Sequence, residues 1–262
     1  KNVSTWWFYS MSSAITLICL FSMVALPSLL NTLAYPVSHS LSMCISNYIV
    51  KVCAPRLFAV LNCYRHFHFW GYKEGVDLPE NFIILSNHQS LLDIPVYMNF
   101  FRDRDVRFVA KDALSRHIPL ISEMLRTQEH CMIPRKAKPM EAMKYMDKFG
   151  KRVVERNQIP IIFPEGTRTR DGNVGKFYSA GFRKLSESSG LPVAVCALDG
   201  GWELRDLPKI MVNLKNGCYR VKVLKVFPCP RTKEEQQQIL DESKILIQTQ
   251  LEKWRKMPSD VR

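Results

Sequence analysis

Beyond residue 71, short apolar runs alternate with longer segments in which apolar side chains recur every three or four residues. Short apolar runs bounded by turn residues are typical of buried strands, and the longer spacing is typical of amphipathic helices. The predicted strands are residues 82–86, 106–110, 130–133, 159–163 and 193–198, and the predicted helices are residues 90–101, 122–126, 139–156 and 180–188. This alternation predicts an α/β domain over residues 71–262.

The last part of the chain adds a predicted hairpin and a long helix. Residues 210–214 and 219–227 are strand-like and flank Asn216-Gly217, a dipeptide that favours tight hairpin turns. Residues 232–256 begin with a capping box and predict a final helix.

The first fifty residues have a different pattern, because residues 2–50 contain no Asp, Glu, Lys or Arg. A bilayer core takes about 20 helical residues. Residues 5–26 supply that length before Pro27, which we expect to interrupt the helix, and a less apolar segment follows at 32–50. An amphipathic helix is then predicted at 51–69. We therefore expect residues 1–70 to be a helical membrane anchor.

Basic residues flank the apolar pair, with Lys1 before it and Lys51, Arg56 and Arg65 after it. Basic residues stay on the cytoplasmic side, so both ends of the pair are expected there, and the anchor is a hairpin or a re-entrant segment. The alternative is a cleaved signal peptide with its cut near Ala34, although the apolar stretch is long for one.

Charge and cysteine content narrow the function classes. The formal net charge of +13 favours anionic partners such as phospholipid head groups, phosphorylated substrates or nucleic acid. The eight cysteines form no C-x-x-C pair, so the sequence predicts neither a zinc site nor a disulfide framework. Reduced thiols are the simplest interpretation. Cys131 is a conceivable nucleophile, but nothing in its sequence surroundings indicates a lowered pKa.

The first candidate motif is Asn87-His88-Gln89-Ser90-Leu91-Leu92-Asp93, which follows the predicted strand at 82–86. If a helix begins at Ser90, Asp93 lies in its first turn and its carboxylate can reach back to the His88 imidazole. Such a dyad keeps one ring nitrogen protonated and leaves the other free to accept a proton as a general base. The alternative is that Asp93 only caps the helix by accepting backbone N–H groups.

The second motif is Phe163-Pro164-Glu165-Gly166-Thr167-Arg168, which follows the predicted strand at 159–163. Gly166 allows the backbone to approach a ligand closely, Thr167 offers a hydroxyl, and Arg168 offers a forked cation suited to phosphate oxygens. Glu165 would repel phosphate and therefore orients Arg168 or binds a substrate hydroxyl. A solvated glycine turn is the alternative. Open α/β sheets bind ligands at the carboxyl ends of their strands, so one pocket can hold both motifs.

In sequence and order, the two motifs resemble the first and third signature blocks of the glycerolipid acyltransferase family. Two weaker blocks agree, at Ile133-Pro134-Arg135 and at Leu191-Pro192-Val193, and Phe108-Val109-Ala110-Lys111 is also similar. The resemblance covers residues 82–198. The second block departs from the family pattern, because it has no Gly and has Pro before Arg135.

The resemblance implies a mixed sheet flanked by helices and acyl transfer to the sn-2 hydroxyl of 1-acyl-glycerol-3-phosphate. It implies His88 and Asp93 as catalytic residues. The implied phosphate-binding residues are Lys111, Arg135, Glu165, Gly166, Thr167 and Arg168. No metal or other cofactor is expected beyond acyl-CoA or acyl carrier protein as donor.

The expected partners are therefore membrane lipids, a lysophospholipid acceptor and the acyl donor, with no nucleic acid. The expected location is a membrane, with the catalytic domain facing the cytoplasm. Two alternatives remain open at this point. One is an acyltransferase for another lysophospholipid or for glycerol-3-phosphate, and the other is a noncatalytic lipid-binding protein of the same fold.

Overall fold

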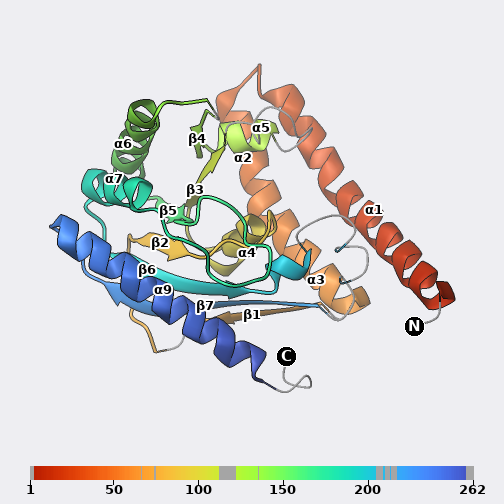
Figure 1. Cartoon of the computed structure of the whole chain (residues 1–262). Helices are drawn as coiled ribbons and strands as arrows, with labels where there is room; N and C mark the ends of the chain where they lie inside the picture. Colours follow the sequence, from red (N-terminus) through yellow and green to blue (C-terminus); the bar gives the residue numbers. More distant parts are fainter. Residues whose placement is uncertain are drawn as a thin grey trace.

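A seven-stranded sheet lies at the centre of the protein, in the order β1-β7-β6-β2-β5-β3-β4 (Figure 1). The computed structural model describes residues 3–65, 67–73, 75–111, 122–134, 136–204, 209, 213 and 217–257. The strands are β1 His68–Tyr72, β2 Ile83–Ser86, β3 Val106–Lys111, β4 Cys131–Ile133, β5 Ile159–Ile162, β6 Val193–Asp199 and β7 Cys218–Phe227.

Five neighbouring strands, β6, β2, β5, β3 and β4, run parallel to one another. Strand β7 is antiparallel to β6, and β1 pairs in parallel with β7. The sheet is therefore mixed, as expected. Because β2 and β5 are adjacent and parallel, the two motifs that follow them begin at the same edge of the sheet.

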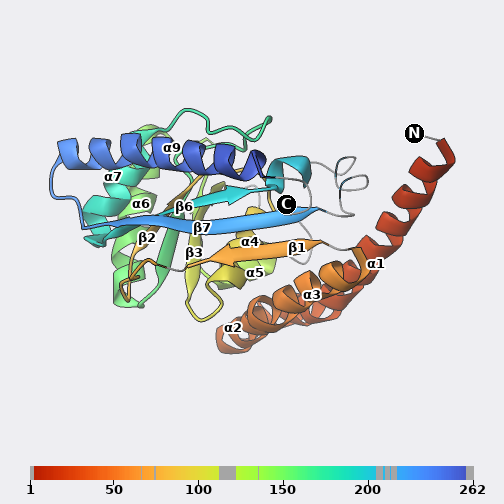
Figure 2. The ribbon, with the colours of Figure 1, turned by 90° about the horizontal axis from the view of Figure 1, so that it is seen from below.

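Helices cover both faces of the sheet (Figure 2). On one face lie α6 (Pro139–Glu155), α7 (Ser179–Ser189) and α9 (Lys233–Arg255). On the other lie α4 (Asp93–Phe100) and the amino-terminal helices. Within β2, Ile84 packs toward α4, whereas Ile83 and Leu85 pack toward the first group. A strand buried on both faces needs apolar residues at every position, which explains its unbroken apolar run.

The strands and helices predicted from residue 82 onward, apart from the strand at 210–214, are confirmed, with shifts of up to three residues at their ends. The expectation for the segment before them is wrong. The helix predicted at 51–69 ends at Arg65, and His68–Tyr72 forms β1. The predicted hairpin partner of β7, residues 210–214, lies outside the described residues except for Asn213, and β7 instead has β6 and β1 at its two edges.

The amino-terminal helices form a layer of their own beside the sheet (Figures 1 and 2). Helix α1 (Val3–Ala34) continues through Pro27, so the interruption expected there is wrong. A proline removes one hydrogen bond, and the bonds on either side can maintain the helix. After a turn, α2 (His39–Tyr48), a π-helical segment η1 (Ile49–Cys53) and α3 (Ala54–Arg65) follow one another without a break.

Several large apolar side chains on the surface of this layer are exposed. Ile18 on α1 is 66% exposed, and Leu26 and Leu33 on the same helix are exposed to a similar degree. Residues His39–Asn62 are long and apolar enough to cross a membrane, by length and composition. Exposed apolar patches of this kind on a helix are typical of a surface that meets lipid or a partner.

A buried set of polar side chains joins the layer to the rest of the protein through α5 (Ser122–Thr127). The Ser42 hydroxyl of α2 donates to Asn31 Oδ1 of α1 over 2.7 Å and lies 2.7 Å from the Thr127 hydroxyl of α5. Ser46 also donates to Asn31 Oδ1. These four residues, which we call the polar seam, fix α1 and α2 against α5 by specific hydrogen bonds.

Candidate active site

His88 and Asp93 form a hydrogen-bonded pair at the carboxyl end of β2. The His88 Nδ1 atom lies 2.8 Å from Asp93 Oδ2. The Asp93 side chain is fully buried, whereas 16% of the His88 side chain is exposed. The imidazole therefore has a fixed partner on one nitrogen and is open to solvent, as a general base requires.

Asp93 Oδ2 also accepts the backbone N–H groups of Gln89 and Ser90, over 2.6 and 2.9 Å. One carboxylate thus serves the imidazole and two backbone donors of the loop, but it does not cap α4, whose N-cap residue is Leu92 and has no side-chain cap bond. Helix α4 begins at Asp93 rather than at Ser90, so the residues between form a tight loop around the carboxylate. Together with the imidazole, these backbone donors hold the carboxylate in one position beside the ring.

The loop that follows β5 surrounds His88 on several sides. The Phe163 ring stacks on the imidazole, with ring centroids 4.3 Å apart and planes inclined by 16°. The Thr169 N–H donates to the His88 carbonyl over 2.9 Å. The second motif therefore contacts the first through its ring and its backbone, and the two motifs form one site.

Glu165 holds the two motifs together. Its carboxylate accepts the His88 N–H over 2.9 Å on one oxygen and the Gly175 N–H over 3.0 Å on the other, and the residue is 3% exposed. Burial raises the pKa of the Glu165 carboxyl above its ordinary value, although the two N–H donors oppose that shift. This placement differs from the predicted phosphate contact, because both oxygens face backbone donors in the interior.

Gly166, Thr167 and Arg168 are exposed on the same loop. Gly166 has a φ of +64°, a left-handed conformation that favours glycine, and a Cβ added there would have no atom within 4 Å. The loop therefore presents an open backbone turn followed by a hydroxyl and a guanidinium. These are the groups that the sequence predicts for a phosphate ligand.

Two other predicted phosphate contacts are placed only in part. Lys111 ends β3 at the same sheet edge as the two motifs, and its side chain lies outside the described part of the protein. Arg135 lies outside the described residues, two positions after the end of β4. Both remain predictions.

The segment that contains the site matches a known protein family. Residues 72–199 match the family model described as Acyltransferase. These residues belong to the acyltransferase family. The acyltransferase segment contains both motifs, β2 to β6 and the helices between them.

Curated relatives of the acyltransferase segment carry one name. A 1-acyl-sn-glycerol-3-phosphate acyltransferase of Limnanthes douglasii is 32% identical over 118 residues, which cover 45% of this chain and 41% of that relative. A protein of the same name from Pseudomonas aeruginosa is 32% identical over 119 residues, which cover 44% of its length. The aligned part thus spans less than half of each relative.

A solved structure matches the fold of nearly the whole chain. It is the 1-acyl-sn-glycerophosphate acyltransferase PlsC of Thermotoga maritima, with a TM-score of 0.68 and 18% sequence identity. The match covers 95% of this chain and 99% of that one. The fold expected for the acyltransferase family, a mixed sheet flanked by helices, is thereby confirmed.

Sequence reasoning missed residues that complete the site from distant strands. The Tyr219 hydroxyl of β7 donates to Asp93 Oδ1 over 2.9 Å. Gln89 accepts the Gly201 N–H over 2.9 Å and donates to Asp199 Oδ1 over 3.1 Å. The Gly200-Gly201 pair directly after a strand was the available signal, because paired glycines often mark close backbone approach.

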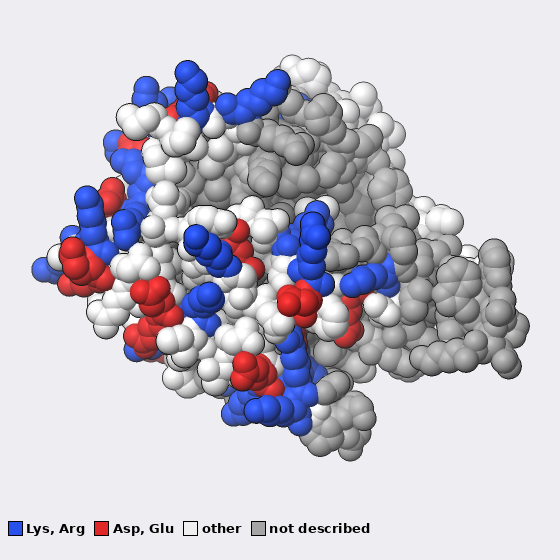
Figure 3. Space-filling model, in the orientation of Figure 1, with Lys and Arg blue, Asp and Glu red and all other residues white. Residues whose placement is uncertain are grey.

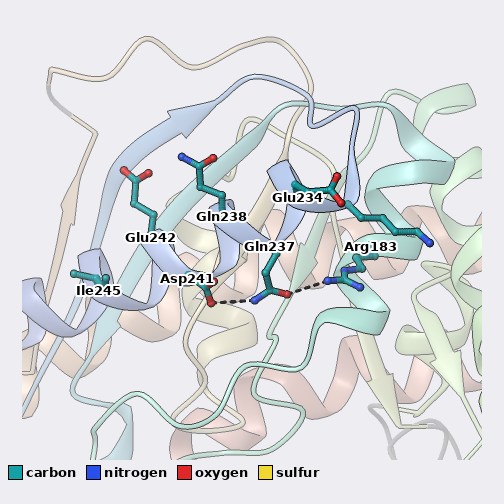
Figure 4. Close-up of a pocket in the computed structure, with 8 residues that line it drawn as sticks. Arg183, Glu234, Gln237, Gln238, Asp241, Glu242 and Ile245 are labelled. Atoms are coloured by element: carbon teal, nitrogen blue, oxygen red, sulfur yellow. Dashed lines mark hydrogen bonds between the residues drawn. The ribbon is translucent and has the colours of Figure 1, made fainter.

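Other features of the described residues do not compete with this site. An open hollow of about 750 Å³ lies along α9 beside α7, where Arg183, Gln237 and Asp241 are hydrogen-bonded in a row (Figure 4). It contains none of the predicted site residues.

Burial raises the pKa of the Cys131 thiol to about 12, which argues against a nucleophilic role. In the described part of the chain, no three His, Cys, Asp or Glu side chains are placed to hold a metal ion.

Replacing Glu165 by alanine tests whether its carboxylate holds the two motifs together through the N–H groups of His88 and Gly175. The change leaves the partly buried N–H groups of His88 and Gly175 without acceptors, at a cost of up to about 1–3 kcal/mol each. It also removes a buried charge, which offsets part of that cost. We expect the free energy of unfolding in urea to fall by about 2 kcal/mol. Glu187→Ala, at an exposed position on α7, should change it by less than about 0.5 kcal/mol. Equal effects of the two substitutions would contradict this role.

Proposed function

We propose that this protein transfers a fatty acyl chain from an acyl thioester to the sn-2 hydroxyl of 1-acyl-glycerol-3-phosphate, which gives phosphatidic acid. The observation that carries the proposal is the partly exposed His88 ring, bonded to Asp93 over 2.8 Å and stacked on the loop that holds Arg168. The names of the curated relatives support the same reaction.

In the proposed mechanism, His88 Nδ1 carries the proton bonded to Asp93 and Nε2 is the free base. Nε2 takes the proton of the acceptor hydroxyl while the hydroxyl oxygen attacks the carbonyl carbon of the thioester. The C–S bond then breaks, the ester carbonyl re-forms, and the leaving thiolate takes the proton from Nε2. The products are a lipid ester and a free thiol, and the ionised Asp93 stabilises the imidazolium between the two proton transfers.

Acceptor recognition is assigned to the phosphate. Arg168 offers parallel N–H groups to two phosphate oxygens, and the open turn at Gly166 leaves room for the phosphate against the backbone. Thr167 adds a hydroxyl. Lys111 and Arg135 are retained as further phosphate contacts from the resemblance. Glu165 positions this loop and the His88 backbone instead.

Membrane association is the third part of the proposal. The exposed apolar side chains of α1 and the apolar helical stretch His39–Asn62 suit a bilayer, and a lysolipid acceptor resides there. Residues 2–50 carry no charged side chain, and Lys51 and Arg56 follow them, which favours a catalytic domain on the cytoplasmic side. Holding the site against the surface shortens the path of acceptor and product.

The basic charge of the protein fits lipid phosphates better than nucleic acid. On the face in Figure 3, Lys and Arg side chains gather toward α6 and α7 with acidic side chains among them. Asp147 there pairs with Lys151 and Lys184, over 2.8 and 2.7 Å. Nucleic-acid sites usually carry clustered cations of one sign, whereas this face mixes both signs.

A thiol-release assay tests the reaction with purified protein and a panel of acceptors. Acyl-CoA and acyl carrier protein thioesters are each offered with 1-acyl-glycerol-3-phosphate, head-group-bearing lysophospholipids or glycerol-3-phosphate. We expect rapid thiol release with 1-acyl-glycerol-3-phosphate. Release confined to another acceptor would replace the substrate, and no release with any acceptor would favour a noncatalytic lipid-binding protein.

A further inference from the structure

Tyr219 brings a hydroxyl group to the catalytic pair from the antiparallel side of the sheet. It lies on β7, it is fully buried, and its hydroxyl donates to Asp93 Oδ1 over 2.9 Å. The two residues are 126 positions apart in sequence. A buried hydroxyl aimed at a buried carboxylate is a specific contact, because a phenylalanine would pack equally well in an apolar interior.

The two oxygens of Asp93 have separate partners. Oδ2 faces the His88 imidazole and the N–H groups of Gln89 and Ser90, all from the loop beside it. Oδ1 faces Tyr219. The carboxylate plane is therefore set by the local loop at one end and by β7 at the other, so Tyr219 controls its rotation.

The backbone around Gly201 leaves just enough room for this contact. A Cβ added to Gly201 would lie 2.7 Å from Asp93 Oδ1 and would also overlap the Tyr219 hydroxyl. Real Cβ atoms do not approach neighbours this closely, so position 201, the second after β6, must be glycine for the tyrosine and the carboxylate to meet. Two segments of the chain are thus shaped around one hydrogen bond.

We propose that Tyr219 is a positioning residue of the acyl-transfer reaction, which holds the Asp93 carboxylate toward His88 and withdraws part of its negative charge. The inference rests on the proposed function for its reaction. Burial raises the pKa of Tyr219 well above its ordinary value, and the neighbouring carboxylate adds to that shift. Tyr219 therefore stays protonated and able to donate at a pH where an ordinary tyrosine would already have lost its proton.

The charge withdrawn by Tyr219 has a measurable consequence. A carboxylate that loses a hydrogen-bond donor holds more negative charge on its oxygens and attracts the imidazolium proton more strongly. Removal of the hydroxyl should therefore keep His88 protonated to a higher pH. A purely structural role would lower stability or activity without moving this titration.

The test compares Tyr219→Phe with Tyr97→Phe. Tyr97 is also fully buried, and its hydroxyl donates to Ser86 over 2.5 Å instead of to the dyad. In Tyr219→Phe, we expect kcat to fall about tenfold. We also expect the acidic limb of the kcat/KM profile to move up by about half a pH unit. In Tyr97→Phe, kcat should stay within about twofold, and the limb should not move.

A second readout separates this inference from the proposed reaction. The ring resonances of His88, assigned by loss in His88→Ala, are titrated by NMR in the wild type and both tyrosine variants without any substrate. A midpoint raised only in Tyr219→Phe supports the positioning role even if no thiol is released in any assay. Unchanged midpoints in Tyr219→Phe would overturn it, whatever the activity.

Discussion

Replacing His88 by alanine should lower kcat by at least about a thousandfold, because it removes the group that takes the hydroxyl proton. The variant should remain folded, since the His88 ring is partly exposed and Asp93 keeps its partners Gln89, Ser90 and Tyr219. Thiol release with acyl-CoA and 1-acyl-glycerol-3-phosphate measures the loss, and thermal unfolding measures the fold. Turnover within tenfold of wild type would remove the proposed base.

Two further variants sharpen this result. His68→Ala changes an exposed histidine on β1 and should leave kcat unaltered. Asp93→Asn keeps the shape of the side chain and an oxygen that can accept the N–H groups of Gln89 and Ser90. It removes the negative charge opposite the imidazolium. It should lower kcat by about a hundredfold or more, with an almost unchanged KM, because the charge matters only as the proton moves.

Replacing Arg168 by alanine should raise the KM for 1-acyl-glycerol-3-phosphate by about 10- to 100-fold. The proposed contact that is lost is a charge-assisted, two-point hydrogen bond to phosphate, and such a bond contributes roughly 1.5–3 kcal/mol. The KM for acyl-CoA should change little, because the donor thioester is not held by this contact. Steady-state kinetics with each substrate varied in turn provide the measurement.

The matched controls for Arg168 lie at the same loop. Arg168→Lys keeps the charge but loses the forked geometry, so its acceptor KM should fall between those of wild type and alanine variant. Arg170→Ala removes another exposed cation two residues away and should have a smaller effect. If Arg168→Ala and Arg170→Ala raised the KM equally, general surface charge would explain acceptor binding, and the phosphate assignment would be wrong.

The sheet strands from β2 onward could be predicted because burial on both faces leaves a clear mark in the sequence. Ile83, Ile84 and Leu85 all need to be apolar, and such a run stands out between polar loops. Strand β1 has no such continuous apolar run. It lies at the sheet edge, its residues are mostly exposed, and its partner β7 lies far along the chain, so its aromatic residues were assigned to the preceding helix.

The same distinction applies to the site. The His88–Asp93 hydrogen bond joins residues five positions apart, and it was predicted from a helix expected to begin at Ser90 together with the resemblance. The structure makes the same contact through a loop, because α4 begins only at Asp93. The Tyr219 contact depends on the order of strands, which no local pattern specifies. Glu165 was placed among the phosphate contacts by the resemblance, and only the fold places two backbone N–H groups opposite its oxygens.

The polar seam of Asn31, Ser42, Ser46 and Thr127 ties α1 and α2 to α5. Apolar contacts permit helices to slide, because one apolar neighbour serves as well as another, whereas hydrogen bonds between particular side chains allow one register. If α1 and α2 insert in lipid as proposed, a change in their depth or tilt is passed to α5 and to β4, the strand that follows α5 in the chain. Bilayer thickness would then influence the height of the sheet edge at which the proposed base lies.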